Sequence, residues 1–192
     1  MPARKCTVAL LGGGPRGVDH AQAFLDNPER FEFVAICDRD PEKLAGLSRL
    51  TGGVGGYADA ATMLAAHRPD VFCFVTPPSI RLPLLQLGLE HGARAIAFEK
   101  PVSLRIDETR AMAALLEQSR VRAVVSQQIK YRSTWRQAKR WLDAGEIGRL
   151  HTMQASSGVW HMQHGPHLTE YMSFFNDHHP IAWVHGTSFG GG

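Results

Sequence analysis

A short glycine-rich segment near the start of the chain could bind phosphate groups. The spacing Gly-x-Gly-x-x-Gly falls on Gly12, Gly14 and Gly17, and Pro15 and Arg16 lie inside it. Here the first glycine permits a tight turn, the second lets the backbone approach a pyrophosphate, and the third lets a helix pack on a strand. Unpaired N–H groups at the start of that helix would favour an anion. The segment predicts a dinucleotide-binding turn, although a plain strand-to-helix connection also satisfies so short a pattern.

An acidic residue follows the second apolar run at the distance typical of ribose recognition. Asp38 lies about 20 residues beyond Gly17. Its carboxylate can accept hydrogen bonds from both ribose hydroxyls and would repel a 2′-phosphate, which favours NAD over NADP. The neighbouring Arg39 leaves NADP open, because an arginine at this place can accommodate the phosphate. We therefore expect NAD as the cofactor, in contact with Asp38 and Arg39.

Two further polar segments each follow an apolar run that has the length of a strand. Thr76-Pro77 and Glu99-Lys100-Pro101 are these segments. The carboxyl ends of parallel strands meet at one edge of a sheet, where ligands bind. We therefore expect Thr76, Pro77 and Glu99 to contact the cofactor and Lys100 to lie at the same crevice. The alternative is that Lys100 is a solvated lysine that follows a strand.

The elements that must position these residues alternate along the chain. Strands are predicted over residues 6–11, 33–37, 71–75, 95–98 and 121–126. Helices are predicted over residues 18–26, 41–50, 59–67, 80–91 and 107–119. This alternation indicates an α/β protein with a doubly wound parallel sheet, the Rossmann architecture. Residues 1–126 are the predicted NAD(P)-binding domain.

The alternation changes after residue 126. We expect a helix over 135–144, a strand-like run from Leu150, a histidine-rich loop over 161–167, a helix over 168–175 and a strand start at 180–188. Residues 127–192 supply too little apolar sequence for an independent core, so we expect the incomplete start of an α+β substrate domain. Its uncovered aromatic residues would promote association. These are Trp160, Phe174, Phe175 and Trp183.

Composition narrows the class of partner. The chain has 192 residues, 44% of them hydrophobic, and a net charge of +3 without a dense basic run, which speaks against nucleic acid. Its apolar runs are shorter than a membrane span needs. Cys6, Cys37 and Cys73 each lie in an apolar run, which indicates buried thiols in a reducing compartment. We expect a cytoplasmic protein with a small-molecule partner and no membrane or nucleic-acid partner.

Taken together, these motifs resemble the Gfo/Idh/MocA family, the glucose–fructose oxidoreductase and inositol dehydrogenase group. The matching segments are residues 8–17, 37–38, 76–78, 99–101, 145–148 and 165–167. The resemblance implies an NAD(P)-dependent oxidoreductase that acts on a sugar, polyol or related hydroxylated compound. It also implies a longer, homo-oligomeric protein of which this chain is a C-terminally truncated form, able to bind NAD and with little or no dehydrogenase activity.

The resemblance further implies roles for residues at the reaction site. Lys100 would stabilise the developing oxyanion and His167 would remove the hydroxyl proton, and both would contact substrate together with Arg132. The family's aspartate, four residues before its histidine, is replaced by Gln163. Glu170 lies one helical turn after His167 and could orient it instead.

Other readings stay open beside this one. His167 could be a surface histidine. The spacing of His161, His164 and His167, three residues apart, is also compatible with a metal site. A glycine–proline pair between these histidines opposes a regular helix and no carboxylate completes the set, so we expect no metal. The protein could also use NAD transiently in elimination or glycoside cleavage, or bind it as a sensor without turnover.

Overall fold

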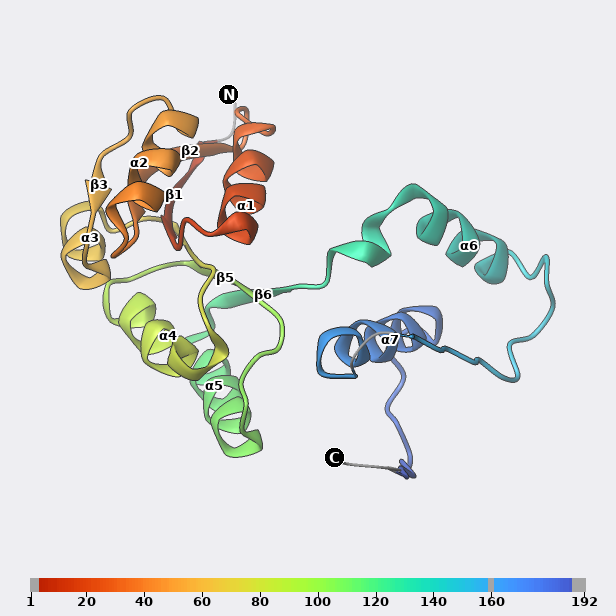
Figure 1. Cartoon of the computed structure of the whole chain (residues 1–192). Coiled ribbons are helices and arrows are strands. Elements are labelled where there is room, and N and C mark those ends of the chain that lie inside the picture. The colour runs from red at the N-terminus through yellow and green to blue at the C-terminus, as the bar shows by residue number, and fades with distance from the viewer. Residues whose placement is uncertain (1–3, 159–160, 188–192) are drawn as a thin grey trace. The chain divides into compact units, whose positions relative to one another are not determined.

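A computed structural model describes residues 4–158 and 161–187, and for residues 161–163 the backbone alone. The chain divides into two compact units, residues 1–126 and 127–192. Figure 1 shows their elements. In the described part of the chain, no helix combines the length and the apolar character that a bilayer crossing requires.

The first unit is built on a parallel sheet of six strands in the order β3-β2-β1-β4-β5-β6. The strands are β1 (Cys6–Leu11), β2 (Phe31–Cys37), β3 (Gly56–Tyr57), β4 (Val71–Phe74), β5 (Ala95–Glu99) and β6 (Arg122–Ser126). The predicted doubly wound parallel sheet is confirmed. The sequence does not predict β3, because a strand of two residues after a glycine-rich break is too short to show a pattern of alternating apolar and polar residues.

Helices cover both faces of this sheet (Figure 1). They are α1 (Pro15–Leu25), α2 (Pro41–Leu50), α3 (Ala60–His67), α4 (Arg81–Glu90) and α5 (Ile106–Ser119). On one face α1 and α2 complete a buried cluster of Leu10, Ala21, Ile36, Leu47 and Cys73. On the other, α3, α4 and α5 complete a cluster that includes Met63, Leu64, Phe72, Phe74, Leu85, Phe98 and Met112. Successive strand residues enter opposite clusters, as the period of two requires.

Local signals set the ends of the helices. α1 begins at Pro15, three residues before its predicted start, because proline already has a helical φ and its missing N–H costs nothing in the first turn. Asp40 caps α2, since its side chain accepts hydrogen bonds from the N–H groups of Glu42 and Lys43. After α4, Gly92 has a φ of +80°, which suits a glycine that ends a helix.

Two of the three thiols are fully buried in the first unit. Burial raises the pKa of Cys37 to about 11 and that of Cys73 to about 12. The third thiol, Cys6, is half-buried. Cys37 and Cys73 therefore stay protonated and act as small apolar side chains.

The second unit is helical in its described residues. It contains the short 3₁₀ helix η2 (Gln128–Tyr131), then α6 (Ser133–Asp143) and α7 (His161–Phe175). Trp135 of α6 packs against Tyr171 and Phe175 of α7, at ring-centroid distances of 4.3 and 5.5 Å. Trp183 is 79% exposed, whereas the predicted uncovered Trp160 lies outside the described residues.

Three sequence predictions for the second unit are wrong. The run from Leu150 and the described residues 180–187 form no strand, because the described part of this unit offers no neighbouring strand to pair with. Residues 161–167 are helical rather than a loop. Pro166 lies inside α7, where its missing N–H removes one backbone hydrogen bond, and the packing of Tyr171 on Trp135 anchors the helix in spite of this loss.

Candidate cofactor site

A cleft of about 500 Å³ lies at the carboxyl ends of β1, β2 and β4. Six of the predicted cofactor contacts line it, namely Gly12, Gly14, Asp38, Arg39, Thr76 and Pro77. These residues come from three separate loops, and the parallel sheet brings the loops to one edge. Pro15, Arg16, Gly17, Glu99 and Lys100 do not line this cleft.

The three motif glycines have different surroundings. Gly12 has a φ of +106°, and a Cβ there would lie 2.3 Å from the carbonyl oxygen of Val75. A Cβ on Gly17 would lie 1.8 Å from the carbonyl oxygen of Gly12, so α1 meets β1 without room for a side chain. Gly14 has no atom within 4 Å of its Cβ position. The turn is therefore tight on the protein side and open in front of α1, as a pyrophosphate group needs.

Backbone N–H groups fix the Asp38 carboxylate at the rim of the cleft. One oxygen accepts from the N–H of Gly13 at 2.6 Å, and the other accepts from the N–H of Asp40 at 2.9 Å. A carboxylate has about four lone-pair positions, so each oxygen retains capacity for one more donor. Two ribose hydroxyls suit that capacity. Arg39 and Lys43 also line the cleft, and Lys43 pairs with Asp40 at 3.1 Å.

Apolar side chains that the sequence analysis missed form another wall of the cleft. They are Ile80, just before α4, and Leu84 and Leu87 within it. Their spacing i, i+4, i+7 places them on one helical face, and this is the signal that could have revealed them. A cleft lined by both apolar side chains and a carboxylate is suited to an aromatic base with an attached ribose.

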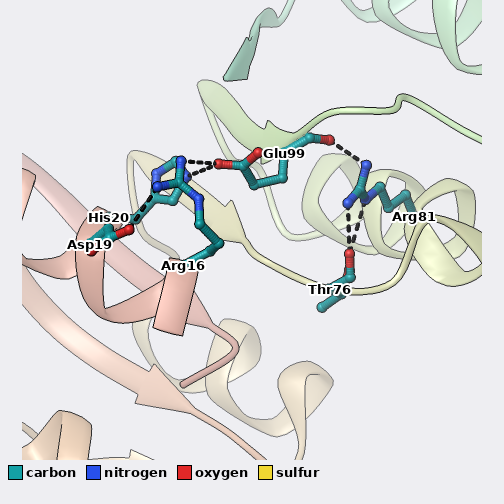
Figure 2. A network of polar contacts seen from close by, with 6 residues as sticks. All are labelled: Arg16, Asp19, His20, Thr76, Arg81 and Glu99. Carbon is teal, nitrogen blue, oxygen red and sulfur yellow. Dashed lines mark hydrogen bonds and ion pairs between the residues drawn. The ribbon is translucent and has the colours of Figure 1, made fainter. Parts of the chain in front are cut away.

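Glu99 does not line this cleft, and its side chain points toward Arg16 and His20 in an ion-pair network with α1 (Figure 2). Its carboxylate accepts from Arg16 Nη2 at 2.7 Å and lies 3.0 Å from His20 Nε2. Arg16 also binds Asp19, one helical turn further on, at 2.6 Å. Burial by itself raises the pKa of Glu99, but the hydrogen bonds from His20 and Arg16 outweigh it and lower the pKa to about 2. Glu99 and Arg16 therefore join β5 to α1.

Replacing Glu99 with glutamine is expected to lower the free energy of unfolding by about 2–3 kcal/mol at pH 7. Folding depresses the pKa of Glu99 from 4.5 to about 2, so its stabilising contribution is present above about pH 4.5 and is lost as the pH falls toward 2. Urea unfolding at several pH values should show the difference between wild type and E99Q shrinking over that interval. The exposed Glu117 supplies a matched E117Q control, and equal curves for both variants would contradict the role of Glu99.

The second unit holds the other predicted site residues. His167 is buried, its ring stacks on Tyr171 at 6.0 Å, and His164 approaches it edge-on at 6.1 Å. Glu170, which we expected to orient His167, accepts a hydrogen bond from the Lys130 ammonium. Arg132 is exposed just after η2.

The predicted metal-ligand spacing and the Gln163 substitution concern residues at the start of α7. The side chains of His161 and Gln163 lie outside the described residues. Among the residues that the structure describes, no three histidine, cysteine or acidic side chains gather as a metal site.

The doubly wound sheet, the glycine turn at α1 and the carboxylate after β2 define the first unit as a Rossmann domain of the dinucleotide-binding class. The sequence pattern of an oxidoreductase family with an NAD-binding Rossmann fold, Gfo/Idh/MocA, matches residues 6–127. The chain belongs to this family.

Individual relatives share this fold over part of their length. D-apiose dehydrogenase from Paraburkholderia graminis is 32% identical over 140 residues, which are 73% of this chain and 37% of that protein. The NAD⁺-dependent scyllo-inositol 2-dehydrogenase from Bacillus subtilis is 27% identical over 141 residues, which are 73% of this chain and 41% of that protein. The chain therefore spans well under half the length of these curated relatives.

A solved structure extends the likeness. Scyllo-inositol dehydrogenase from Lactobacillus casei, with bound NAD(H) and scyllo-inositol, superimposes with a TM-score of 0.79 at 18% identity. The match covers 90% of this chain and 56% of that one. At this identity the likeness shows the fold alone.

Proposed function

We propose that the protein is an NAD-dependent dehydrogenase that transfers hydride between the nicotinamide and a hydroxyl-bearing carbon of a sugar, polyol or related compound. The observation that carries the proposal is the cleft itself, which combines the open Gly14 turn with the anchored carboxylate of Asp38. Family membership and the activities of the relatives, which are dehydrogenases of apiose and inositol, support the same chemistry.

Different residues of the cleft would bind different parts of NAD. The N–H groups at the start of α1, beside Gly14, would hold the pyrophosphate, and Asp38 would accept from the ribose hydroxyls. The apolar wall that begins at Ile80 would cover the adenine. NAD, when bound, supplies the hydride acceptor.

Lys100 and His167 are the proposed catalytic residues. An ammonium group close to the substrate oxygen stabilises the negative charge that develops there, which is the role we assign to Lys100. An imidazole ionises near neutral pH and can take the hydroxyl proton, which is the role we assign to His167. Arg132 would contact the substrate.

Replacing Asp38 with alanine is expected to weaken NAD binding by about 10-fold or more, because two hydrogen bonds to a charged acceptor are lost. Discrimination against NADP should fall at the same time, since the negative charge that repels a 2′-phosphate is gone. Calorimetric titration of the wild type and of D38A with NAD and with NADP measures both effects. Asp26, exposed after α1, gives a matched D26A control. A wild-type preference for NADP would overturn the assignment of NAD.

The dehydrogenase chemistry needs its own test. In a form of the protein with a complete substrate domain, we expect NAD reduction, followed by its absorbance, with at least one member of a panel of sugars and polyols. If that form binds NAD and reduces it with no member of the panel, the dehydrogenase proposal is contradicted, and a protein that binds the cofactor without net turnover is favoured.

A further inference from the structure

Arg81, which the sequence analysis did not single out, is a buried cation that contacts two loops of the cofactor domain. Only 3% of the residue is exposed. Its Nε and Nη2 donate to the carbonyl oxygen of Thr76 at 3.2 and 2.7 Å. Its Nη1 donates to the carbonyl oxygens of Glu99 and Pro101. Figure 2 shows the guanidinium between Thr76 and Glu99.

The position of Arg81 is unfavourable for the helix that carries it. Arg81 is the first residue of α4, where the positive end of the helix dipole repels a cation. Burial also disfavours the charged form and lowers the pKa of Arg81. These two local costs indicate that the guanidinium serves contacts beyond its own helix.

The part that it serves is the backbone on both sides of Lys100. Glu99 and Pro101 are the neighbours of Lys100, and Arg81 binds the carbonyl groups of both. The Glu99 carboxylate is held from the opposite direction by Arg16 and His20 of α1. Residue 99 is therefore restrained at its side chain by one helix and at its carbonyl by another.

We propose that Arg81 is a positioning residue that fixes the backbone around Lys100 relative to the loop at Thr76, which lines the cofactor cleft. A guanidinium group is planar and carries five N–H donors in a fixed fork, so it can reach three carbonyls at once. A lysine ammonium at the same place cannot span both loops. The inference rests on the proposed function for the role of Lys100, whereas the restraint on the backbone does not depend on it.

Hydrogen exchange in the NAD-free protein tests the restraint. In R81K and R81M, the amides of residues 99, 100, 102 and 103 are expected to exchange about 10-fold faster, because hydrogen bonds to a buried charged donor are lost. R81K keeps the charge and serves as the milder variant if R81M does not fold. Arg94 offers a matched control, since it is exposed and pairs with Asp70 at 3.3 Å, so R94K should leave these amides unchanged. Unchanged exchange in both Arg81 variants would overturn the proposal.

Comparing turnover with NAD affinity separates positioning from a general loss of structure. In R81K, made in a form of the protein with measurable dehydrogenase activity, turnover should fall by about 10-fold because Lys100 is displaced, while NAD affinity changes by less than about 2-fold. Equal losses of turnover and NAD affinity would contradict positioning and indicate a merely structural arginine. Absence of NAD binding by the wild type would instead defeat the proposed function, and the exchange experiment would still decide the restraint.

Discussion

An alanine at position 17 is expected to destabilise the first unit by more than about 3 kcal/mol and to abolish NAD binding. The new Cβ would lie 1.8 Å from the carbonyl oxygen of Gly12 and 2.8 Å from its carbon. Backbone atoms on both sides of this contact cannot rotate out of the way, so α1 must shift relative to β1. The N–H groups that face the pyrophosphate would move with it.

Urea unfolding and calorimetric NAD titration measure these two losses in G17A. A matched control is G46A, because the Cβ position of Gly46, inside α2, meets only the guanidinium of Arg49 at 3.9 Å. Removing that helical glycine should stabilise the protein by about 0.5–1 kcal/mol. A G17A protein with wild-type stability and affinity would show that the contact between α1 and β1 is not needed.

Replacing Lys100 with methionine is expected to lower the turnover number by about 100-fold or more in a form of the protein with measurable dehydrogenase activity. Methionine approximates the length of the lysine stem and removes the ammonium that would stabilise the developing oxyanion. NAD affinity should change much less, because the residues that we propose to bind the pyrophosphate and the ribose lie on other loops of the cleft.

Steady-state kinetics with separate NAD titration distinguish the two effects of K100M. Lys5, exposed just before β1, provides the matched K5M control, which should leave turnover unchanged. Near-normal turnover of K100M would remove Lys100 from the chemistry. A loss confined to NAD affinity would make it a binding residue only.

The sequence predicts the sheet and the cleft well because their signals are local. Five apolar runs identify five of the six strands, and the strand ends then locate the Gly12, Asp38 and Thr76 loops at one edge. Local signals also fix Asp40 as a helix cap. Each of these inferences needs only a few neighbouring residues and the known geometry of a parallel sheet.

Long-range polar contacts could not be predicted in the same way. Arg16 and Glu99 form a hydrogen bond although they lie 83 positions apart in the sequence. No short pattern around either residue indicates which residue is its partner. The sequence predicts Glu99 as a cofactor contact and does not reveal that its carboxylate binds Arg16 and His20 of α1. Arg81 is hidden for the same reason, since its partners are carbonyl groups, which every residue possesses.

The second unit shows a different limit of local patterns. An apolar run becomes a strand only beside another strand, and Leu150 has no such neighbour in the described part of its unit. Conversely, Pro166 suggests a loop, but the packing of Trp135 on Tyr171 favours a helix there. Tertiary contacts decided both segments.

The joint between α1 and β5 bears on how related sequences can diverge. The Glu99 carboxylate is buried and is paired with both Arg16 and His20, so loss of both basic residues would leave a buried charge without compensation. Sequences that replace Arg16 and His20 with neutral residues should therefore also have replaced Glu99. Correlated substitution at these three positions would be the evolutionary record of the contact.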